Sequence, residues 1–413
     1  MKSGAASVLS RIVGGGWFFL LAASAPGQLV LSTSGPGAVV RIFNTDLAVL
    51  ESGERRTDLP CSVTPNKPVL GFDLRFHASY EVTVPLRELA GSENQLTILF
   101  RVTAESRPQE PVYFLQRFRV PPIEEDAKGD AYLQGAFDVG EGKYRVEWLM
   151  RDRTERVCSA FWETEAVLPP KDRQIDLAIR PGMIEQAERE QFREEPPVMR
   201  IAEEQPLNIK ILINFAPQNS HAAALQPIDT SALVSILRSI VRDPRLGRFT
   251  LVAFNLQQQK VLYRQEQAER IDFPALGEAL KSLNLGTVDV SRLAEKHAET
   301  SFLTRLLRRE LDTRDQAPPD AVIIAGPKAL LEEGIPQEAL KEIGEVSFPV
   351  FYMNYNLSPQ QIPWTDAIGK AVKFLKGQEY TISRPRDLWY AVTEIVSRIA
   401  RSKHGRRVTT STE

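Results

Sequence analysis

The sequence predicts a two-domain protein, an all-β sandwich followed by an α/β domain whose sheet is doubly wound and mostly parallel. The chain has 413 residues, more than one ordinary hydrophobic core accommodates. From residue 29 to 166 polar and apolar side chains alternate with a period of two, whereas from residue 207 continuous apolar runs alternate with helical patterns. We therefore expect the sandwich over residues 28–166, a linker over 167–206 and the α/β domain over 207–401.

The N-terminus is typical of a cleavable secretory signal peptide, residues 1–27. Lys2 and Arg11 precede an apolar run from Ile12 to Ala25, the charge pattern that the export machinery accepts. The run is shorter than the roughly 20 residues of a membrane-spanning helix, so we favour cleavage after Gly27 over a permanent anchor or a buried helix. The mature protein, secreted or periplasmic, would begin near Gln28.

The first domain is expected to be immunoglobulin-like. Its sharpest segment is VGEGKYRVEWLMRD, residues 139–152, where a glycine-containing turn leads into a strand with Tyr144, Val146 and Trp148 on one face. This segment resembles the turn-then-strand segments of immunoglobulin-like modules, and the resemblance implies a sandwich of that type.

Both cysteines of the chain, Cys61 and Cys158, fall in this first domain. Export would expose them to an oxidising compartment, so we expect a disulfide between them, with two buried thiols as the alternative. There is no CxxC spacing and no Cys/His cluster, which argues against a structural zinc site or a thioredoxin-type centre.

The linker and the second domain have a distinct pattern. The charged, proline-rich linker contains one short helical stretch, Met183 to Glu194, bounded by Pro-Gly and Pro-Pro. Expected strands of the second domain cover residues 207–215, 248–256, 260–265, 320–326 and 348–355. Expected helices cover residues 231–243, 273–284, 301–312, 337–344, 368–377 and 388–400. Residues 402–413 are polar and basic, and we expect a disordered tail there.

This order of elements resembles the von Willebrand factor type A family, in the degenerate form found in exported acidobacterial proteins. Members of that family hold a metal ion through an Asp-x-Ser-x-Ser run after the first strand and an acidic residue after the fourth strand. This chain has Asn214, Ala216 and Gln218 at the first three positions, and Ala325 and Gly326 at the last. The resemblance implies a Rossmann-like domain with no metal at the usual place, and we expect no cofactor.

A displaced substitute for the metal ligands stands further along, at Asp229. It is followed by Thr230 and Ser231, just before an apolar helical pattern. Such residues commonly cap a helix by accepting hydrogen bonds from free backbone N–H groups. We favour the cap, and a metal ligand is the alternative.

Two long loops supply the candidate binding residues. They run from Asn214 to Pro227 and from Met353 to Trp364, and follow apolar strands whose carboxyl ends present ligand-binding loops in doubly wound sheets. Aromatic side chains supply contact area at low entropic cost, although they equally often only pack a loop. The candidate binding residues are Asn214, Gln218, Asn219, Ser220, Tyr355 and Trp364.

Composition and motifs exclude several functions. The formal net charge is -2, with no basic excess for nucleic acid, and no GxSxG, GxGxxG, GxxxxGK[ST] or HExxH run is present. We predict an exported, non-catalytic protein-interaction protein, with a protein partner in the envelope or outside the cell and no membrane span after cleavage. The alternative is an exported hydrolase whose site lies in the cleft between the domains.

Overall fold

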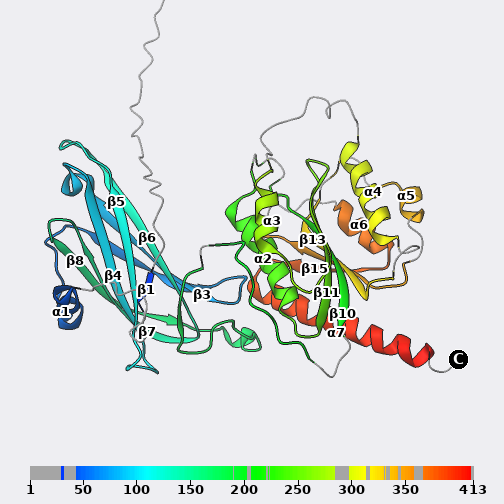
Figure 1. The fold of residues 1–413 in the computed structure, drawn as a ribbon, viewed down its shortest axis with the longest axis horizontal. Coiled ribbons are helices and arrows are strands. Elements are labelled where there is room, and N and C mark those ends of the chain that lie inside the picture. Colours follow the sequence, from blue (N-terminus) through cyan, green and yellow to red (C-terminus); the bar gives the residue numbers. More distant parts are fainter. Residues whose placement is uncertain are drawn as a thin grey trace, which may run out of the picture. The chain divides into compact units, whose positions relative to one another are not determined.

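The computed structural model describes two compact units (Figure 1). The described residues are 29–31, 43–188, 190–201, 206–219, 222, 224–283, 297–312, 317–329, 331, 335–342, 346–357 and 366–410. The N-terminal unit takes the described residues up to Pro68, His77–Ala166 and Pro181–Gln186; the C-terminal unit takes Val69–Phe76, Val167–Arg180 and the chain from Ala187 onward. The predicted signal peptide, Ser220 and Trp364 lie outside the described residues.

The N-terminal unit contains two β-sheets. The five-stranded sheet has the order β1 (Leu29–Leu31), β5 (Val112–Val120), β4 (Asn94–Ala104), β7 (Gly142–Arg151) and β8 (Val157–Ala166), and its neighbours are all antiparallel. The four-stranded sheet has the order β2 (Ser62–Leu70), β3 (Phe76–Pro85), β6 (Asp130–Val139) and β9 (Ile184–Gln186). Successive residues of β3 alternate between buried and partly exposed positions, as the period of two in the sequence predicts.

Aromatic side chains form the core of this unit. The rings of Phe100 and Phe114 stack with centroids 4.8 Å apart, and Tyr80 meets Trp148 edge to face at 5.9 Å. Tyr80 and Trp148 are both completely buried. Rings in these arrangements contribute stabilisation beyond the burial of their area.

A helix that the sequence did not predict, α1 (Asn44–Ser52), packs against the five-stranded sheet. Leu50 joins Leu99 and Leu149 in a small apolar cluster. Arg151 on β7 pairs with Asp46 at 3.2 Å and lies 4.2 Å from the centre of the Phe43 ring. Burial raises the pKa of Asp46, and the charge of Arg151 opposes that rise.

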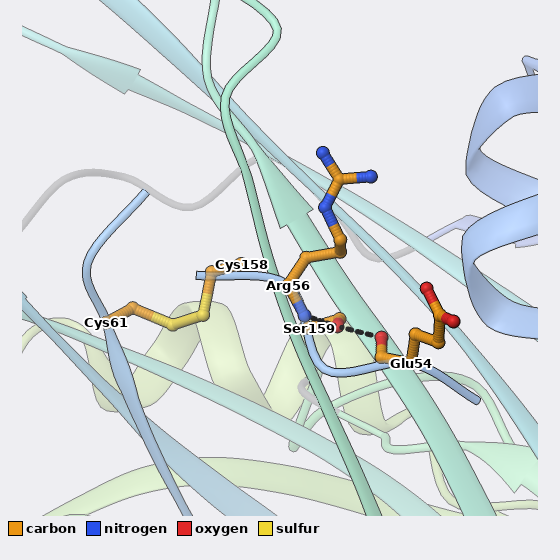
Figure 2. Close-up of a disulfide and its surroundings, with 5 residues drawn as sticks. All are labelled: Glu54, Arg56, Cys61, Cys158 and Ser159. Atoms are coloured by element: carbon orange, nitrogen blue, oxygen red, sulfur yellow. Dashed lines mark hydrogen bonds between the residues drawn. A yellow bond between two sulfur atoms is a disulfide. The ribbon is translucent and has the colours of Figure 1, made fainter. Parts of the chain in front are cut away.

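The predicted disulfide is confirmed. Cys61 and Cys158 are 97 residues apart in sequence, and the bond joins them with their Cα atoms 6.2 Å apart. The chain just before Cys61 runs along β8: the Ser159 Oγ accepts from the Arg56 backbone N at 2.7 Å and donates to the Glu54 carbonyl at 3.0 Å (Figure 2). The disulfide thus fixes a segment that covers the edge strand β8, whose backbone would otherwise be open to pairing.

The predicted helix from Met183 to Glu194 is wrong. The structure has a short strand there, β9, whose Ile184–Gln186 pairs with Phe137–Val139 of β6. Gly182 begins this strand from a left-handed conformation, φ 73°, which favours glycine. From Ala187 the segment belongs to the C-terminal unit. Its residues are therefore divided between the two units and do not form one solvated helical face.

The C-terminal unit is built on one six-stranded sheet. Its order is β12 (Lys260–Ala268), β11 (Leu246–Asn255), β10 (Leu207–Asn214), β13 (Ala321–Pro327), β14 (Val350–Tyr355) and β15 (Gln378–Ile382). Neighbours are parallel except β11 and β12, which are antiparallel. The described helices are α2 (Pro227–Val241), α3 (Phe273–Leu280), α4 (Ala298–Leu311), α5 (Gln337–Lys341), α6 (Ala367–Phe374) and α7 (Pro385–Thr410).

Two apolar clusters cover the two faces of this sheet. Ile211 of β10 packs in a cluster with residues of α2 and α7, such as Leu233 and Ile395. Its neighbour Leu212 packs in the other cluster with residues of α4 and α6, such as Leu303 and Ile368. Because successive strand side chains point to opposite faces, a continuous apolar run supplies both cores.

The fold class expected from the sequence needs correction. Strands hold 37% of the described residues and helices 26%, so the described chain is mainly β, distributed over three sheets. The C-terminal sheet is mixed, with one antiparallel pair, β11 and β12, and it does not establish a von Willebrand factor type A domain. The reason is that the alternation of apolar runs and helical patterns predicts elements but does not fix a fold family.

The C-terminal end also differs from expectation. Helix α7 continues to Thr410, whereas a disordered tail was expected from residue 402, and this part of the prediction is wrong. Lys403 contributes to holding the helix, because its Nζ donates to the Asp320 carboxylate at 2.7 Å. Among the described helices, none combines the length and the apolar character that crossing a membrane requires.

Candidate functional site

The candidate site lies where β10 and β14 end, at the carboxyl edge of the C-terminal sheet. Asn214 is the last residue of β10 and Tyr355 the last residue of β14. The structure brings Asn214, Gln218 and Tyr355 to this edge, as the order of the strands predicts.

Asn214 holds the ends of neighbouring strands together. It is 1% exposed, and its Oδ1 accepts a hydrogen bond from the Leu256 backbone N at 3.1 Å. On its other side Gly326 approaches closely: a Cβ there would lie 2.8 Å from the Asn214 Cβ, and Gly326 has a φ of 154°. Asn214 is therefore a buried structural residue, and its side chain is not available to a partner.

Asp229 stabilises the start of α2. It lies in the first turn, and its Oδ2 accepts from the Gln226 backbone N at 3.2 Å. Its Oδ1 accepts from the Gln218 backbone N at 3.3 Å and from the Tyr355 hydroxyl at 3.1 Å. The predicted capping role of Asp229 is seen in a different form: the helix begins earlier, Gln226 is its N-cap residue, and Asp229 lies three positions inside as part of a capping box. With both oxygens already accepting hydrogen bonds, Asp229 is poorly suited to the alternative role of metal ligand.

Tyr355 is completely buried. Its hydroxyl lies 2.9 Å from the Ala216 carbonyl and 3.1 Å from the Asp229 Oδ1. Burial raises the pKa of this phenol far above its ordinary value, and the nearby Asp229 carboxylate adds to the rise. The prediction that Tyr355 offers a surface contact is corrected: its ring fills the core and its hydroxyl joins two loops.

Gln218 connects the two predicted loops. Its Nε2 donates to the Asn356 Oδ1 at 3.3 Å, and its Oε1 accepts from the Leu357 backbone N at 2.6 Å. Gln218 is half-buried, and the next residue, Asn219, is exposed. The amide thus fixes the position at which Asn219 reaches solvent. Of the other two candidates, Ser220 and Trp364 lie outside the described residues.

An exposed apolar residue that the sequence reasoning missed completes this surface. Ile228, in the first turn of α2, is 56% exposed, and Gln226 beside it is exposed as well. The signal available in the sequence was an isoleucine placed before the regular apolar pattern of the helix. We call Gln218, Asn219, Gln226 and Ile228 the binding edge. Amides and an apolar side chain on a fixed backbone can form hydrogen bonds and apolar contacts, but they supply no acid or base.

A second arrangement that the sequence did not reveal lies in the N-terminal unit. The His77 Nδ1 is 2.7 Å from the Asp138 Oδ1, and the Asp138 side chain is fully buried. The two residues are 61 positions apart in sequence, so no local motif marks them. The carboxylate orients the imidazole ring, which is partly exposed.

Comparisons with known proteins leave the family open. No protein-family model matches the chain, and no curated protein matches it. The structures that it is similar to are distant. The PilB minor pilin from Streptococcus sanguinis has 8% identity and a TM-score of 0.28, with 73% of this chain and 87% of that chain covered. A second structure of that pilin, a point mutant, has 7% identity and a TM-score of 0.27, with 82% of this chain and 78% of that chain covered.

A Bacteroides uniformis β-glucuronidase is also among the similar structures. It has 11% identity and a TM-score of 0.18, and the match covers 76% of this chain and 38% of that chain. Scores this low do not establish a shared fold for any of these proteins. The resemblance to the von Willebrand factor type A family gains no support from the comparisons, and function has to be argued from this chain's own residues.

Proposed function

We propose that this chain is an exported, non-catalytic interaction protein that binds a protein partner through the binding edge. The observation that carries the proposal is that the buried polar groups there are hydrogen-bonded within the chain. Asp229 caps a helix and accepts from Tyr355, while Gln218 joins two loops. Asn219, Gln226 and Ile228 are exposed there, and the Gln226 Nε2 donates to the Ala224 carbonyl at 3.4 Å.

This surface suits recognition of a protein. Its backbone is fixed by hydrogen bonds before a partner arrives, which lowers the entropic cost of association. An exposed isoleucine among amides offers apolar contact surrounded by adaptable hydrogen-bonding groups. The groups at the expected metal positions, Asn214, Ala216 and Gln218, include no carboxylate, so binding at this edge is proposed to need no metal.

Export is the second part of the proposal. The confirmed disulfide supports it, because structural disulfides persist in oxidising compartments. Mass spectrometry of the protein purified from its native cells tests it: a mature chain that begins near Gln28 is the expected result, and a chain that retains Met1 contradicts it. Fractionation then distinguishes the periplasm from the medium.

A matched pair of substitutions tests the binding edge. Ile228→Asp places a charge on the edge, while Ile201→Asp places the same charge on an isoleucine that is 41% exposed near the start of β11. The mature protein, immobilised, is used to capture its partner from the envelope fraction, and the affinity for that partner is then measured with both variants. The proposal predicts at least a tenfold loss for Ile228→Asp and an unchanged affinity for Ile201→Asp. Equal affinities would contradict it.

A further inference from the structure

A cluster of oxygen-bearing side chains on the other face of the C-terminal sheet has no role in the proposed function. It lies where β14 and β15 meet the start of α6. Its members are Asn354 of β14, Asp366 just before α6, and Glu379 of β15. We call these three residues the α6 cluster. Tyr352, two residues before Asn354 on the same strand, packs with the apolar residues of α6, whereas Tyr355 packs in the opposite cluster.

Only one of the two carboxylate oxygens of Asp366 accepts backbone hydrogen bonds. Its Oδ1 accepts from the backbone N atoms of Ile368 and Ala329, both at 3.1 Å, which caps α6. Its Oδ2 is buried and has no hydrogen-bond partner. The hydroxyl of Tyr352 donates to the Pro327 carbonyl at 3.1 Å. The same hydroxyl also interacts with the Asp366 carboxylate and partly offsets the rise of its pKa.

Asn354 also has a buried acceptor without a hydrogen-bond partner. The residue is completely buried, and its Nδ2 donates to the Glu379 Oε1 at 2.7 Å and to the Thr381 Oγ1 at 3.2 Å. The side chain is thereby aimed at the carboxylate of Glu379, and its Oδ1 has no partner. Buried acceptors are nearly always satisfied in folded proteins, so an unpaired one is a candidate position for binding a water molecule or an ion.

Gly369 of α6 leaves open the space between the two carboxylates. A Cβ at this position would lie 3.1 Å from the Asp366 Oδ2 and 3.3 Å from the Glu379 Oε2. The Asp366 Oδ2, which has no hydrogen-bond partner, and the Oε2 of Glu379, whose side chain is 41% exposed, therefore border the same small space beside the helix. Any larger residue at 369 would fill it.

The charges at this place are unbalanced. Lys328 is the nearby cation, with its Nζ 4.0 Å from the Glu379 Oε1, and it faces two carboxylates. Burial raises the pKa of Asp366, and burial together with the charge of Asp366 raises the pKa of Glu379. A further positive charge between the two carboxylates would offset the cost of keeping both of them ionised.

We propose that the α6 cluster binds a divalent cation with hard oxygen ligands, Ca²⁺ or Mg²⁺. The Asp366 Oδ2, the Glu379 Oε2 and the Asn354 Oδ1 would be its protein ligands, and water would complete the coordination. Oxygen ligands without nitrogen or sulfur select these two ions over transition metals. The ion would join α6 to β14 and β15 and thereby stabilise the C-terminal unit. It would also amend the expectation of no cofactor, at a place unrelated to Asp229.

Isothermal titration calorimetry of the mature protein with CaCl₂ and with MgCl₂ tests this site. Asp366→Asn and Glu379→Gln each remove one charge, and Asn keeps the cap of α6. Asp229→Asn is the matched control at the other candidate acid. Thermal unfolding with and without each salt gives a second readout, and circular dichroism establishes that each variant is folded.

The expected result is one ion per chain, with a rise in unfolding temperature. Asp366→Asn and Glu379→Gln lower the affinity at least tenfold, and Asp229→Asn leaves it unchanged. Ca²⁺ is the ligand if it binds more tightly than Mg²⁺, and Mg²⁺ if the order is reversed. The absence of both heat and thermal shift in the wild type overturns the proposal, as does binding that survives both cluster substitutions or that only Asp229→Asn abolishes. The proposed function is tested separately through Ile228, so each idea can fail alone.

Discussion

Removing the disulfide should destabilise the N-terminal unit strongly and leave the C-terminal unit unchanged. The bond between Cys61 and Cys158 closes a loop with a sequence separation of 97 residues. For a loop of this size, the loss of entropy in the unfolded chain corresponds to about 4.7 kcal/mol at 25 °C. Both cysteines lie in the N-terminal unit, so the whole effect should fall on its unfolding. Cys61→Ala combined with Cys158→Ala removes the bond and leaves no thiol behind.

Urea unfolding followed by tryptophan fluorescence measures the effect. In a background with Trp364→Phe and Trp389→Phe, the mature protein keeps Trp148 and Trp162, both in the N-terminal unit. With a slope of about 2 kcal/mol per M urea, the midpoint should fall by roughly 2 M. Reduction of the unsubstituted cysteines with dithiothreitol is the matched control and should give the same midpoint. A midpoint that moves by less than roughly 0.5 M would refute the reasoning. In the reverse background, with Trp148→Phe and Trp162→Phe, the midpoint of the C-terminal unit should not move, and a shift there would refute it as well.

Three further predictions concern single side chains. Tyr355→Phe removes the hydroxyl that joins Ala216 and Asp229, and should lower the stability of the C-terminal unit by about 1–3 kcal/mol in urea unfolding without changing partner affinity; an unchanged midpoint would contradict the assigned bonds. Gly135→Ala places a Cβ 2.1 Å from the Tyr80 ring and should cost about 1–3 kcal/mol by the same assay, whereas a neutral effect would mean that the ring has room to move. Because the pKa of Asp366 is raised above its ordinary 3.8 by burial, the folded chain holds this proton more tightly than the unfolded chain, so this group's contribution to stability falls as pH rises from the unfolded through the folded pKa. Asp366→Asn should therefore flatten the decline of unfolding free energy with pH and raise stability at pH 7 when no divalent cation is present; an unaltered pH slope would count against a buried carboxylate.

Strands were predictable from the sequence because burial imposes a period. The alternation around Tyr144, Val146 and Trp148 defines β7, and all three side chains are buried. The continuous run ending at Asn214 defines β10 for the same reason. Helix α1 was missed because its apolar residues are few, and its position depends on contacts of Asp46 and Phe43 with Arg151. Such contacts leave no local pattern in the sequence.

The segment after residue 182 shows why charge runs mislead. Glu188 and Glu195 approach Arg238 of α2 at 3.5 and 2.8 Å, so they balance a buried arginine. In the sequence the same charges resemble the solvated face of a helix. Only the tertiary structure distinguishes a paired carboxylate from a solvated one.

The candidate site was predictable in place but not in detail. The carboxyl ends of adjacent parallel strands meet at one edge, so Asn214, Gln218 and Tyr355 could be brought together from the sequence alone. The burial of these side chains could not be predicted from the sequence, because it depends on which hydrogen bonds the loops form. The α6 cluster was missed for a related reason: Asn354, Asp366 and Glu379 are spread along the sequence with no motif between them.

Site-specific photo-cross-linking tests the central claim, recognition of a protein through the binding edge, most directly. A benzophenone amino acid is placed at Ile228 in one chain and at the control position Ile201 in another, and each chain is irradiated in cells. The account predicts that Ile228 forms an adduct with one protein, that purified unlabelled mature chain competes for that protein in the envelope fraction, and that Ile201 forms no such adduct. An adduct of the same yield from Ile201, or no adduct from Ile228, would contradict it.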